Sequence, residues 1–294
     1  MRFVSCKIDG EDCWGVVVNS DTPQPQIVNL TPHFKGDLKT AIATGRLQEA
    51  AEWAAGREQT IPLAEVELQA PIPNPGKIIC IGVNYANRNA EYKDGSAPPE
   101  YPSVFMRTIE SLGAHGQPVW RPPESLQLDY EGEIVVVIGK PGRRIAEADA
   151  YDHIAGLTIM NEGTIRDWLR HAKFNVTQGK NFVNTGAVGP WLVSADEFSA
   201  EHYENMRIRT FINDEQRQND TTANMMFPIK YLISYCSKFY HLKPGDMIAT
   251  GTPNGAGARF DPPKYLLPGD TIRVVVEGVG ELVHGVIDEP LSAQ

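Results

Sequence analysis

One short stretch, "LDYEGEIVVVIGK" (residues 128–140), sets the strongest constraint on how this chain can fold. The unbroken apolar run Ile134–Ile138 is typical of a buried β-strand. Two glutamates, Glu131 and Glu133, stand where this strand begins, and Asp129 precedes them. Because alternate residues of a strand point to the same side, these carboxylates share one face. The fold must therefore place acidic side chains at the entrance of a buried strand.

Three interpretations of this acidic entrance are open from the residues alone. The carboxylates can form a solvated strand end, they can pair with arginines in a structural network, or they can bind a hard metal ion. Carboxylates on one face repel each other and raise each other's pKa. A divalent cation such as Mg²⁺, which takes carboxylates and waters as ligands, removes that penalty. A metal site would need a further acidic group from another segment.

The segment "GLTIMNEGTIRDWLRHAKFNVTQGKNF" (156–182) supplies such a group. Glu162 follows an apolar strand, and Gly163 behind it allows a sharp turn. Lys180 arrives downstream through Gly179. A lysine next to carboxylates can stabilise a negative charge that develops on a substrate oxygen.

The chain divides by composition into a small unit and a large one. The first unit, residues 1–70, carries short strand candidates and a helical spacing from Leu38 to Trp53. The proline-rich stretch "QAPIPNPGK" (69–77) favours an extended connector. We therefore expect a small N-terminal domain over 1–70 and a main domain over 71–294.

The main domain is rich in strand patterns and poor in helix patterns. The expected elements are strands at 77–83 and 156–160, a helix at 228–240, a turn–strand–turn at 243–255, and a hairpin of strands 271–277 and 281–287. The regular alternation of strands and helices in a doubly wound sheet is absent. These patterns predict an α+β fold built on a mixed β-roll or barrel.

Charge and hydropathy exclude several classes of partner. The formal net charge of −10 and the pI of about 5.2 argue against nucleic acid and against anionic membranes. No apolar run is long enough to span a bilayer, and the charged N-terminus does not resemble a signal peptide. The four cysteines show no CxxC spacing, which is typical of reduced thiols. We expect a cytoplasmic protein.

Several motifs, in a fixed order, resemble those of the fumarylacetoacetate hydrolase family. They are "PIPNPGKIICIGVNY" (71–85), "LDYEGEIVVVIGK" (128–140), "GLTIMNEGTIRDW" (156–168), "QGKNF" with "GPWLV" (178–193) and "LKPGDMIATGTPNG" (242–255). The resemblance covers about residues 71–294. It implies a mixed β-roll catalytic domain, a small N-terminal segment and a homodimer.

The resemblance implies a metal site and its ligands. The family's E-x-E pair and its later acidic residue map onto Glu131, Glu133 and Glu162, which would bind Mg²⁺ or Mn²⁺. The usual third ligand is aspartate, and glutamate is one methylene longer. Mg²⁺ tolerates little distortion of its octahedron. We expect either a backbone that is set back at Glu162 or a ligand that binds through water.

The resemblance also assigns substrate-binding and catalytic residues. The family's lysine maps to Lys180 and its arginine to Arg166. The glycine–threonine pair that contacts substrate maps to Gly251 and Thr252, and Arg166 and Tyr85 are the other expected substrate-binding residues. In these roles the metal polarises a carbonyl and Lys180 stabilises developing charge.

The chain departs from the family in the lid segment "NYANRNAEY" (84–92). Glu91 is retained, but Arg88 stands at the position of the histidine that activates water. Arginine stays protonated in proteins, so Arg88 cannot act as the general base. Three alternatives follow: Glu91 activates water with His115 or His171 in place of the missing histidine, Arg88 instead binds a substrate carboxylate, or the enzyme does not hydrolyse its substrate.

Three functions follow from the resemblance. The leading one is a metal-dependent hydrolase of C–C bonds in acylpyruvate-like or β-diketo acids, acting in aromatic-compound catabolism on a small oxo-acid. The second is an isomerase or decarboxylase of a related oxo-diacid through the same metal-bound enolate. The third is an inactive paralogue kept as a binding protein, which the complete set of ligands disfavours.

Overall fold

The computed structural model describes residues 1–87, 99–171 and 175–290, and its strands form two large sheets and one small sheet. The larger sheet follows the order β4-β3-β2-β1-β14-β12-β11-β17-β6-β7, with β5 on β1 and β8 on β14. Its strands are β1 (Arg2–Ile8), β2 (Glu11–Val18), β3 (Gln26–Asn29), β4 (Ile61–Pro62), β5 (Glu67–Leu68), β6 (Ile78–Ile81), β7 (Val104–Arg107), β8 (Leu112–Ala114), β11 (Gly132–Ile138), β12 (Ile154–Asn161), β14 (Gly186–Ser194) and β17 (Met247–Ala249).

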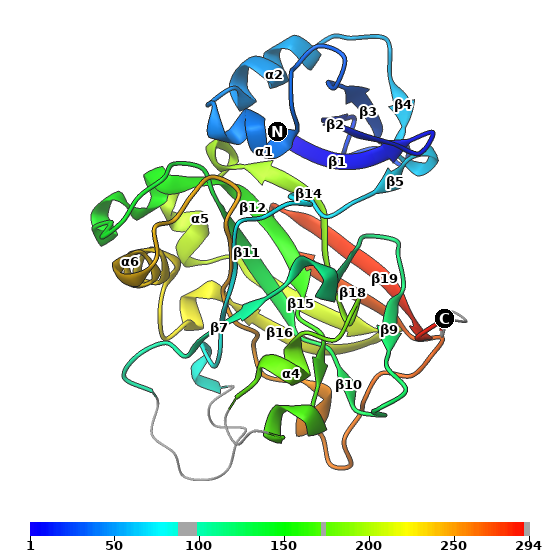
Figure 1. Cartoon of the computed structure of the whole chain (residues 1–294), viewed down its shortest axis with the longest axis vertical. Helices are drawn as coiled ribbons and strands as arrows, with labels where there is room; N and C mark the ends of the chain where they lie inside the picture. The colour runs from blue at the N-terminus through cyan, green and yellow to red at the C-terminus, as the bar shows by residue number, and fades with distance from the viewer. Residues whose placement is uncertain (88–98, 172–174, 291–294) are drawn as a thin grey trace.

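The second large sheet follows the order β16-β15-β18-β19-β9 and packs beside β11, β12 and β14 (Figure 1). Its strands are β9 (Val119–Arg121), β15 (Arg207–Ile212), β16 (Glu215–Thr221), β18 (Thr271–Val276) and β19 (Gly280–Asp288). The small sheet pairs β10 (Leu128–Asp129) with β13 (Thr164–Ile165).

Helices are short. They are α1 (Leu38–Ala43), α2 (Leu47–Ala54), α4 (Thr177–Lys180), α5 (Ala200–Glu204) and α6 (Ile229–Phe239), with 3₁₀ turns η1 (Leu63–Glu65), η2 (Ile109–Ser111), η3 (Glu147–His153), η4 (Asp167–Arg170), η5 (Ala195–Glu197), η6 (Thr222–Asn224) and η7 (Gly257–Arg259). Within the described residues no helix has the length and apolar character needed to cross a membrane. The predicted α+β class is confirmed. Within the described residues the sheets do not close on themselves, so the fold is a β-roll and not a closed barrel.

The helical spacing from Leu38 to Trp53 resolves into two helices instead of one. Asp37 caps α1 by accepting a hydrogen bond from the backbone N–H of Thr40. The helix ends at Ala43, and Gly45 then adopts a left-handed backbone with a φ of 67°. The apolar residues keep a helical spacing beyond this turn, because α2 begins at Leu47.

The N-terminal strands extend the main sheet. β1 pairs antiparallel with β14, so that Arg2 lies opposite Val193 and Phe3 opposite Leu192. Figure 1 shows β1–β5, α1 and α2 at one end of the molecule, and α4 and β10 at the opposite end. The domain boundary near residue 70 stays a prediction.

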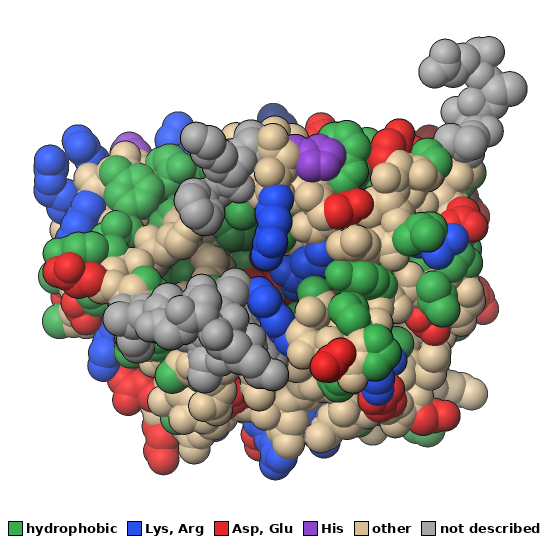
Figure 2. Space-filling model, turned by 90° about the horizontal axis from the view of Figure 1, so that it is seen from below, with side chains coloured by type: hydrophobic (Ala, Val, Ile, Leu, Met, Phe, Trp, Pro, Cys, Tyr) green, Lys and Arg blue, Asp and Glu red, His purple; other side chains and the backbone are tan. Residues whose placement is uncertain are grey.

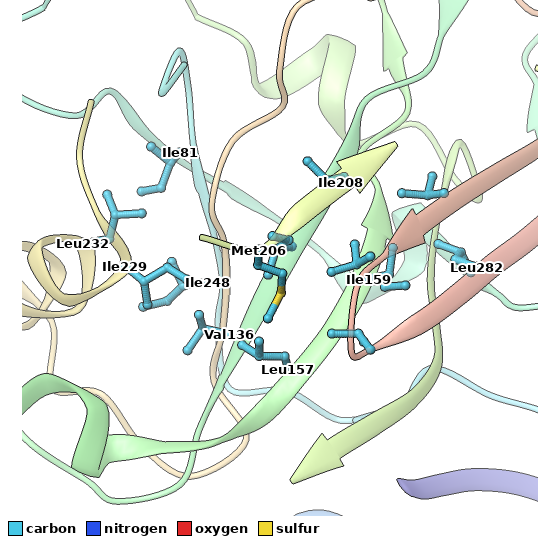
Figure 3. Packing of buried hydrophobic residues seen from close by; sticks show 14 of the residues in the cluster. Ile81, Val136, Leu157, Ile159, Met206, Ile208, Ile229, Leu232, Ile248 and Leu282 are labelled. Carbon is cyan, nitrogen blue, oxygen red and sulfur yellow. The ribbon is translucent and has the colours of Figure 1, made fainter. Parts of the chain in front are cut away.

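The strand β11 is buried on both faces, which explains its continuous apolar run. Ile134, Val136 and Ile138 face the main core, while Val135 and Val137 face a second core that the N-terminal strands complete. Figure 3 shows part of the main core, where side chains from β11, β12, β15, α6 and β17 meet. Burial of each such side chain stabilises the fold by roughly 1.5–3 kcal/mol. This rigid strand supports the glutamates at its start.

Candidate active site

A cavity of about 190 Å³ opens at the start of β11. The end of the molecule that carries α4 and β10 is hollowed at its centre, and Lys and Arg side chains gather around the hollow (Figure 2). The cavity has an acidic floor with two cations and a largely apolar wall. The described residues that line it are Ile81, Gly82, Val83, Ser103, Phe105, Glu131, Glu133, Glu162, Arg166, Leu169, Val176, Lys180 and Thr252.

Main-chain hydrogen bonds tie the acidic segments together. The Glu162 N–H donates to the Glu131 carbonyl at 2.7 Å. The Glu131 N–H donates to Asn161 Oδ1 at 2.9 Å. Gly132, between the two glutamates, packs so closely against β15 that an added Cβ would lie 2.2 Å from Thr210 Oγ1. The E-G-E sequence therefore lets the strand pack tightly on one side and present carboxylates on the other.

The three predicted metal ligands converge. Oxygen atoms of Glu131, Glu133 and Glu162 lie within 4.8 Å of one another, and the three side chains are 5%, 1% and 1% exposed. The interpretation as a solvated strand end is therefore wrong. Burial, followed by the charges of Glu162 and Glu131, raises the pKa of Glu133 well above its ordinary value. Among the residues that the structure describes, Glu162 Oε1 is buried without a hydrogen-bond partner.

This donor set fits a hard divalent cation. Such an ion accepts carboxylate oxygens, satisfies an orphaned oxygen such as Oε1 of Glu162, and offsets the mutual repulsion of crowded carboxylates. The observation agrees with the predicted site but does not distinguish Mg²⁺ from Mn²⁺.

Two cations, the buried Lys180 and the half-buried Arg166, face the same carboxylates. Lys180 Nζ donates to Glu162 Oε2 at 2.7 Å and also to Glu131 Oε2. Arg166 donates from Nη2 to Glu131 Oε1 at 2.6 Å. Burial opposes the charged form of Lys180, but Glu131 and Glu162 outweigh it and raise the pKa above its ordinary value. Glu131 and Asp129 likewise outweigh burial and raise the pKa of Arg166. Both side chains are therefore cationic at neutral pH.

Asp129 forms the arginine network that the sequence left open. Its buried carboxylate accepts from Arg166 Nε at 2.7 Å, from the Gly257 N–H at 2.8 Å and from the Ala258 N–H at 2.9 Å. It thus holds Arg166 against Glu131 and fixes the loop that follows Thr252. The metal-site and arginine-network interpretations overlap in this segment: Asp129 and Glu131 pair with Arg166, and Glu131 also belongs to the acidic cluster.

Gly251 and Thr252 contact the acidic strand. The Gly251 N–H donates to Glu133 Oε2 at 2.8 Å, and the Thr252 hydroxyl donates to the Gly132 carbonyl at 3.0 Å. Thr252 also lines the cavity. Tyr85 is fully buried in the main core, away from the cavity lining, and its hydroxyl has no partner in the described parts of the chain. Its predicted contact with substrate stays a prediction.

The residues of the lid motif can be followed only in part. Arg88 and Glu91 lie outside the described residues. His115 lines a different depression of about 630 Å³ beside the N-terminal strands. His171 is exposed and lies against Trp168, with ring centroids 4.2 Å apart. Neither histidine lines the 190 Å³ cavity.

Two supporting residues lack a local sequence signal. His284, on β19, lies with Nε2 3.1 Å from Asn161 Nδ2, and its Nδ1 lies 3.2 Å from the Gly285 carbonyl. Because Asn161 donates through its amide nitrogen, Nε2 of His284 must accept and Nδ1 must carry the proton. Phe105, on β7, places its ring under the Lys180 ammonium at 5.2 Å. Both residues come from distant strands, and only the fold brings them to the site.

Comparison with known proteins identifies the chain's relatives. The model of the fumarylacetoacetate (FAA) hydrolase C-terminal family matches residues 77–287. Oxaloacetate tautomerase YisK of Bacillus subtilis is 42% identical over 264 residues, which span 85% of this chain and 86% of that protein. The 4-hydroxyphenylacetate degradation bifunctional isomerase/decarboxylase of Salmonella dublin is 38% identical over 74% of this chain. The match spans 48% of that longer protein.

Solved structures agree with these matches. A fumarylacetoacetate hydrolase from Exiguobacterium antarcticum superposes with a TM-score of 0.84 at 29% identity, over 98% of this chain and all of that one. Maleylpyruvate hydrolase from Sphingobium sp. SYK-6, in complex with manganese and pyruvate, gives a TM-score of 0.79 at 27% identity. That match covers 98% of this chain and 99% of the other.

Proposed function

The chain belongs to the fumarylacetoacetate hydrolase family, and we propose that it interconverts the enol and keto forms of oxaloacetate or a closely related 2-oxo diacid. The name and 42% identity of the Bacillus relative support this reaction, as does the isomerase activity in the name of the Salmonella relative. The observation that carries the proposal is the pair of cations, buried Lys180 and half-buried Arg166, beside a carboxylate cluster in a cavity of about 190 Å³.

Glu131, Glu133 and Glu162 would hold a divalent ion, Mg²⁺ or Mn²⁺. When bound, the ion supplies a Lewis acid that polarises the 2-oxo group. The unpartnered buried oxygen of Glu162 and the manganese complex of the Sphingobium relative support this assignment.

Lys180 would stabilise the enolate oxygen. Its ammonium has three N–H donors, of which two are directed at Glu131 and Glu162. The third N–H has no acceptor among the described residues and can donate to a substrate oxygen. A preorganised donor in a buried cavity acts most strongly where charge develops.

Arg166 would bind a substrate carboxylate. Its Nε and Nη2 atoms are engaged by Asp129 and Glu131, which fix the plane of the guanidinium. Its Nη1 makes no hydrogen bond to the described residues, and the side chain lines the cavity. A guanidinium held in this way offers a directional, charge-assisted contact to a carboxylate.

The chemistry of tautomerisation matches these residues better than hydrolysis does. The reaction moves one proton from the enol oxygen to the neighbouring carbon and needs no water or co-reactant. No histidine lines the cavity within the described residues, and Arg88 stands at the family's water-activating position. Hydrolysis of C–C bonds stays a prediction, as do aromatic catabolism, cytoplasmic location and the homodimer.

The experiment follows the fate of freshly dissolved enol oxaloacetate in buffer with Mg²⁺. We expect the purified chain to accelerate the loss of the enol's ultraviolet absorbance, with keto-oxaloacetate as the product by NMR. Pyruvate and CO₂ as products would show a decarboxylase, and oxalate with acetate would show a C–C hydrolase. Either product pair without catalysed tautomerisation would overturn the proposal.

A further inference from the structure

Arg107, the last residue of β7, is a buried arginine that the proposed function leaves unused. Its exposed fraction is 3%. Nε donates to Ser111 Oγ at 3.0 Å, and Nη1 donates to the Gly163 carbonyl at 2.8 Å. Nη2 donates to the Ser111 carbonyl at 3.2 Å and to Thr185 Oγ1 at 3.4 Å. All of these acceptors are neutral oxygens.

This environment is unusual for a buried cation. Burial of a charge costs several kcal/mol in general, and buried charges usually have an ionic partner. Lys180 and Arg166 follow that rule, since both bind carboxylates directly. Arg107 instead donates to main-chain and hydroxyl oxygens of three separate segments, at Ser111, Thr185 and Gly163. Gly163 directly follows the third acidic residue of the cluster.

The turn after Glu162 is confined from two sides. A Cβ added to Gly163 would lie 1.7 Å from the Thr185 carbonyl oxygen, so this main chain packs directly on its neighbour. The Gly163 carbonyl is held by Arg107, and the Gly163 N–H donates to the Asn161 carbonyl at 2.9 Å. The same guanidinium also contacts Thr185. Movement of this turn would move the backbone from which Glu162 projects.

We propose that Arg107 is a positioning residue that fixes the Glu162–Gly163 turn and thereby sets how far the Glu162 carboxylate reaches toward the metal. The inference rests on the metal site of the proposed function. The reach of the Glu162 side chain is then matched to a backbone that Arg107 and Thr185 hold in place.

The test measures Mn²⁺ binding to the metal-free protein by calorimetry and by the paramagnetic signal of free Mn²⁺. Arg107→Lys keeps the charge and loses the fork that joins Gly163, Ser111 and Thr185. We expect its Kd for Mn²⁺ to rise by roughly 10–100-fold, the usual effect of losing a residue that orients a metal ligand. Arg121→Lys is the matched control, since Arg121 is a half-buried arginine that pairs with Asp288 on β19. Its Kd should stay unchanged.

A double-mutant cycle separates positioning from general stability. Glu162→Asp should weaken Mn²⁺ binding in the parent, because the shorter carboxylate retracts from a fixed backbone. The same Glu162→Asp change should raise the Kd for Mn²⁺ by a clearly smaller factor in the Arg107→Lys background, because the turn can shift there. If the double variant raises the Kd for Mn²⁺ by the product of the two single factors, the inference is overturned. An Arg107→Lys protein that melts at a lower temperature but binds Mn²⁺ like the parent would also overturn it.

A milder variant and a ligand variant complete the design. If Arg107→Lys fails to fold, Ser111→Ala removes one acceptor of the guanidinium and should still raise the Kd for Mn²⁺ severalfold, while an unchanged Kd would overturn the inference. Glu131→Ala with Glu133→Ala tests the site itself. If the protein with both changes still binds Mn²⁺, the metal assignment is refuted. An unchanged Kd in Arg107→Lys would instead refute only the positioning role of Arg107.

Discussion

Lys180 and Glu162 form a buried pair in which Lys180 Nζ donates to Glu162 Oε2 at 2.7 Å, while Oε1 of the same carboxylate finds no partner in the described parts of the chain. The two residues arrive from different elements, since Lys180 ends α4 and Glu162 follows β12. One carboxylate therefore faces a fixed cation on one side and offers a lone oxygen on the other. This arrangement joins the proposed metal site to the proposed oxyanion donor.

Glu131→Ala combined with Glu133→Ala should abolish stabilisation by metal. In the parent, Mg²⁺ at about 100 times its Kd should raise the free energy of unfolding by about 2.7 kcal/mol, because the ion binds only the folded chain. Melting curves with Mg²⁺ and with EDTA measure this shift. Glu58→Gln, at an exposed position far from the cluster, should keep it. A full Mg²⁺ shift in the double variant would rule out these ligands.

Lys180→Met should lower kcat for tautomerisation by about 10²–10³, the usual loss for one oxyanion donor. The side chain keeps its length but loses its charge, and the Mg²⁺-induced stabilisation should remain. Because the carboxylates raise the pKa of Lys180, the parent's pH–rate profile should show no lysine ionisation near neutral pH. Lys140→Met, on the surface, should behave like the parent. Equal turnover in Lys180→Met would refute the role.

The sequence predicted the elements that carry the site better than the contacts that support it. The run Ile134–Ile138 predicted a buried strand, and the spacing of Glu131 and Glu133 predicted carboxylates on one side, because both depend only on the strand period. The pattern could not show that Gly45 splits the first helical segment, since a helical period continues on either side of a turn.

Residues that contact the site from distant parts of the chain have no local sequence pattern. Arg107 and His284 reach the site from β7 and β19, and neither belongs to a motif that names its role. Asp129 looked equivalent to Glu131 and Glu133 in the sequence, yet its carboxylate binds Arg166 and two main-chain amides. Side chains on alternate residues of one segment can therefore take different roles once the surrounding loops are in place.

His284 should make stability depend on pH. Burial, with a smaller contribution from His115, lowers the pKa of His284 to about 4, although the Gly285 carbonyl opposes the shift. An unfolded imidazole titrates near 6.5. As the pH falls from about 6.5 to 4, the unfolded chain binds a proton that the folded chain excludes. The free energy of unfolding should then decline, by up to about 3 kcal/mol from this residue alone.

His284→Gln isolates that contribution. Urea unfolding of the metal-free protein between pH 4.5 and 7 should show a shallower decline for His284→Gln than for the parent, whatever the variant's stability at pH 7. His241→Gln, at an exposed histidine, provides the control and should run parallel to the parent. Parallel curves for His284→Gln would mean that the buried imidazole does not control acid stability.

The role of Arg88 distinguishes a tautomerase from a hydrolase, and substitutions at this position test that role. If Arg88 binds a substrate carboxylate through both arms of its fork, Arg88→Lys should raise KM by about tenfold, since a bidentate charged contact contributes about 1.5–3 kcal/mol. The value of kcat should change less. Arg143→Lys, at an exposed arginine, should leave both constants unchanged. Equal kinetic constants in Arg88→Ala and the parent would exclude any role in binding.

Arg88→His tests whether arginine at position 88 is the reason that the enzyme lacks hydrolase activity. Arg88 stands three residues before Glu91 in the sequence, and a histidine at position 88 would regain a group able to accept a proton from water. We expect Arg88→His to cleave an acylpyruvate slowly, where the parent gives no pyruvate, and to lose part of its tautomerase activity. Arg88→Gln controls for loss of the charge alone and should cleave nothing. Cleavage by the parent itself would instead show that water is activated without a histidine at this position, and the tautomerase proposal would lose its main chemical argument.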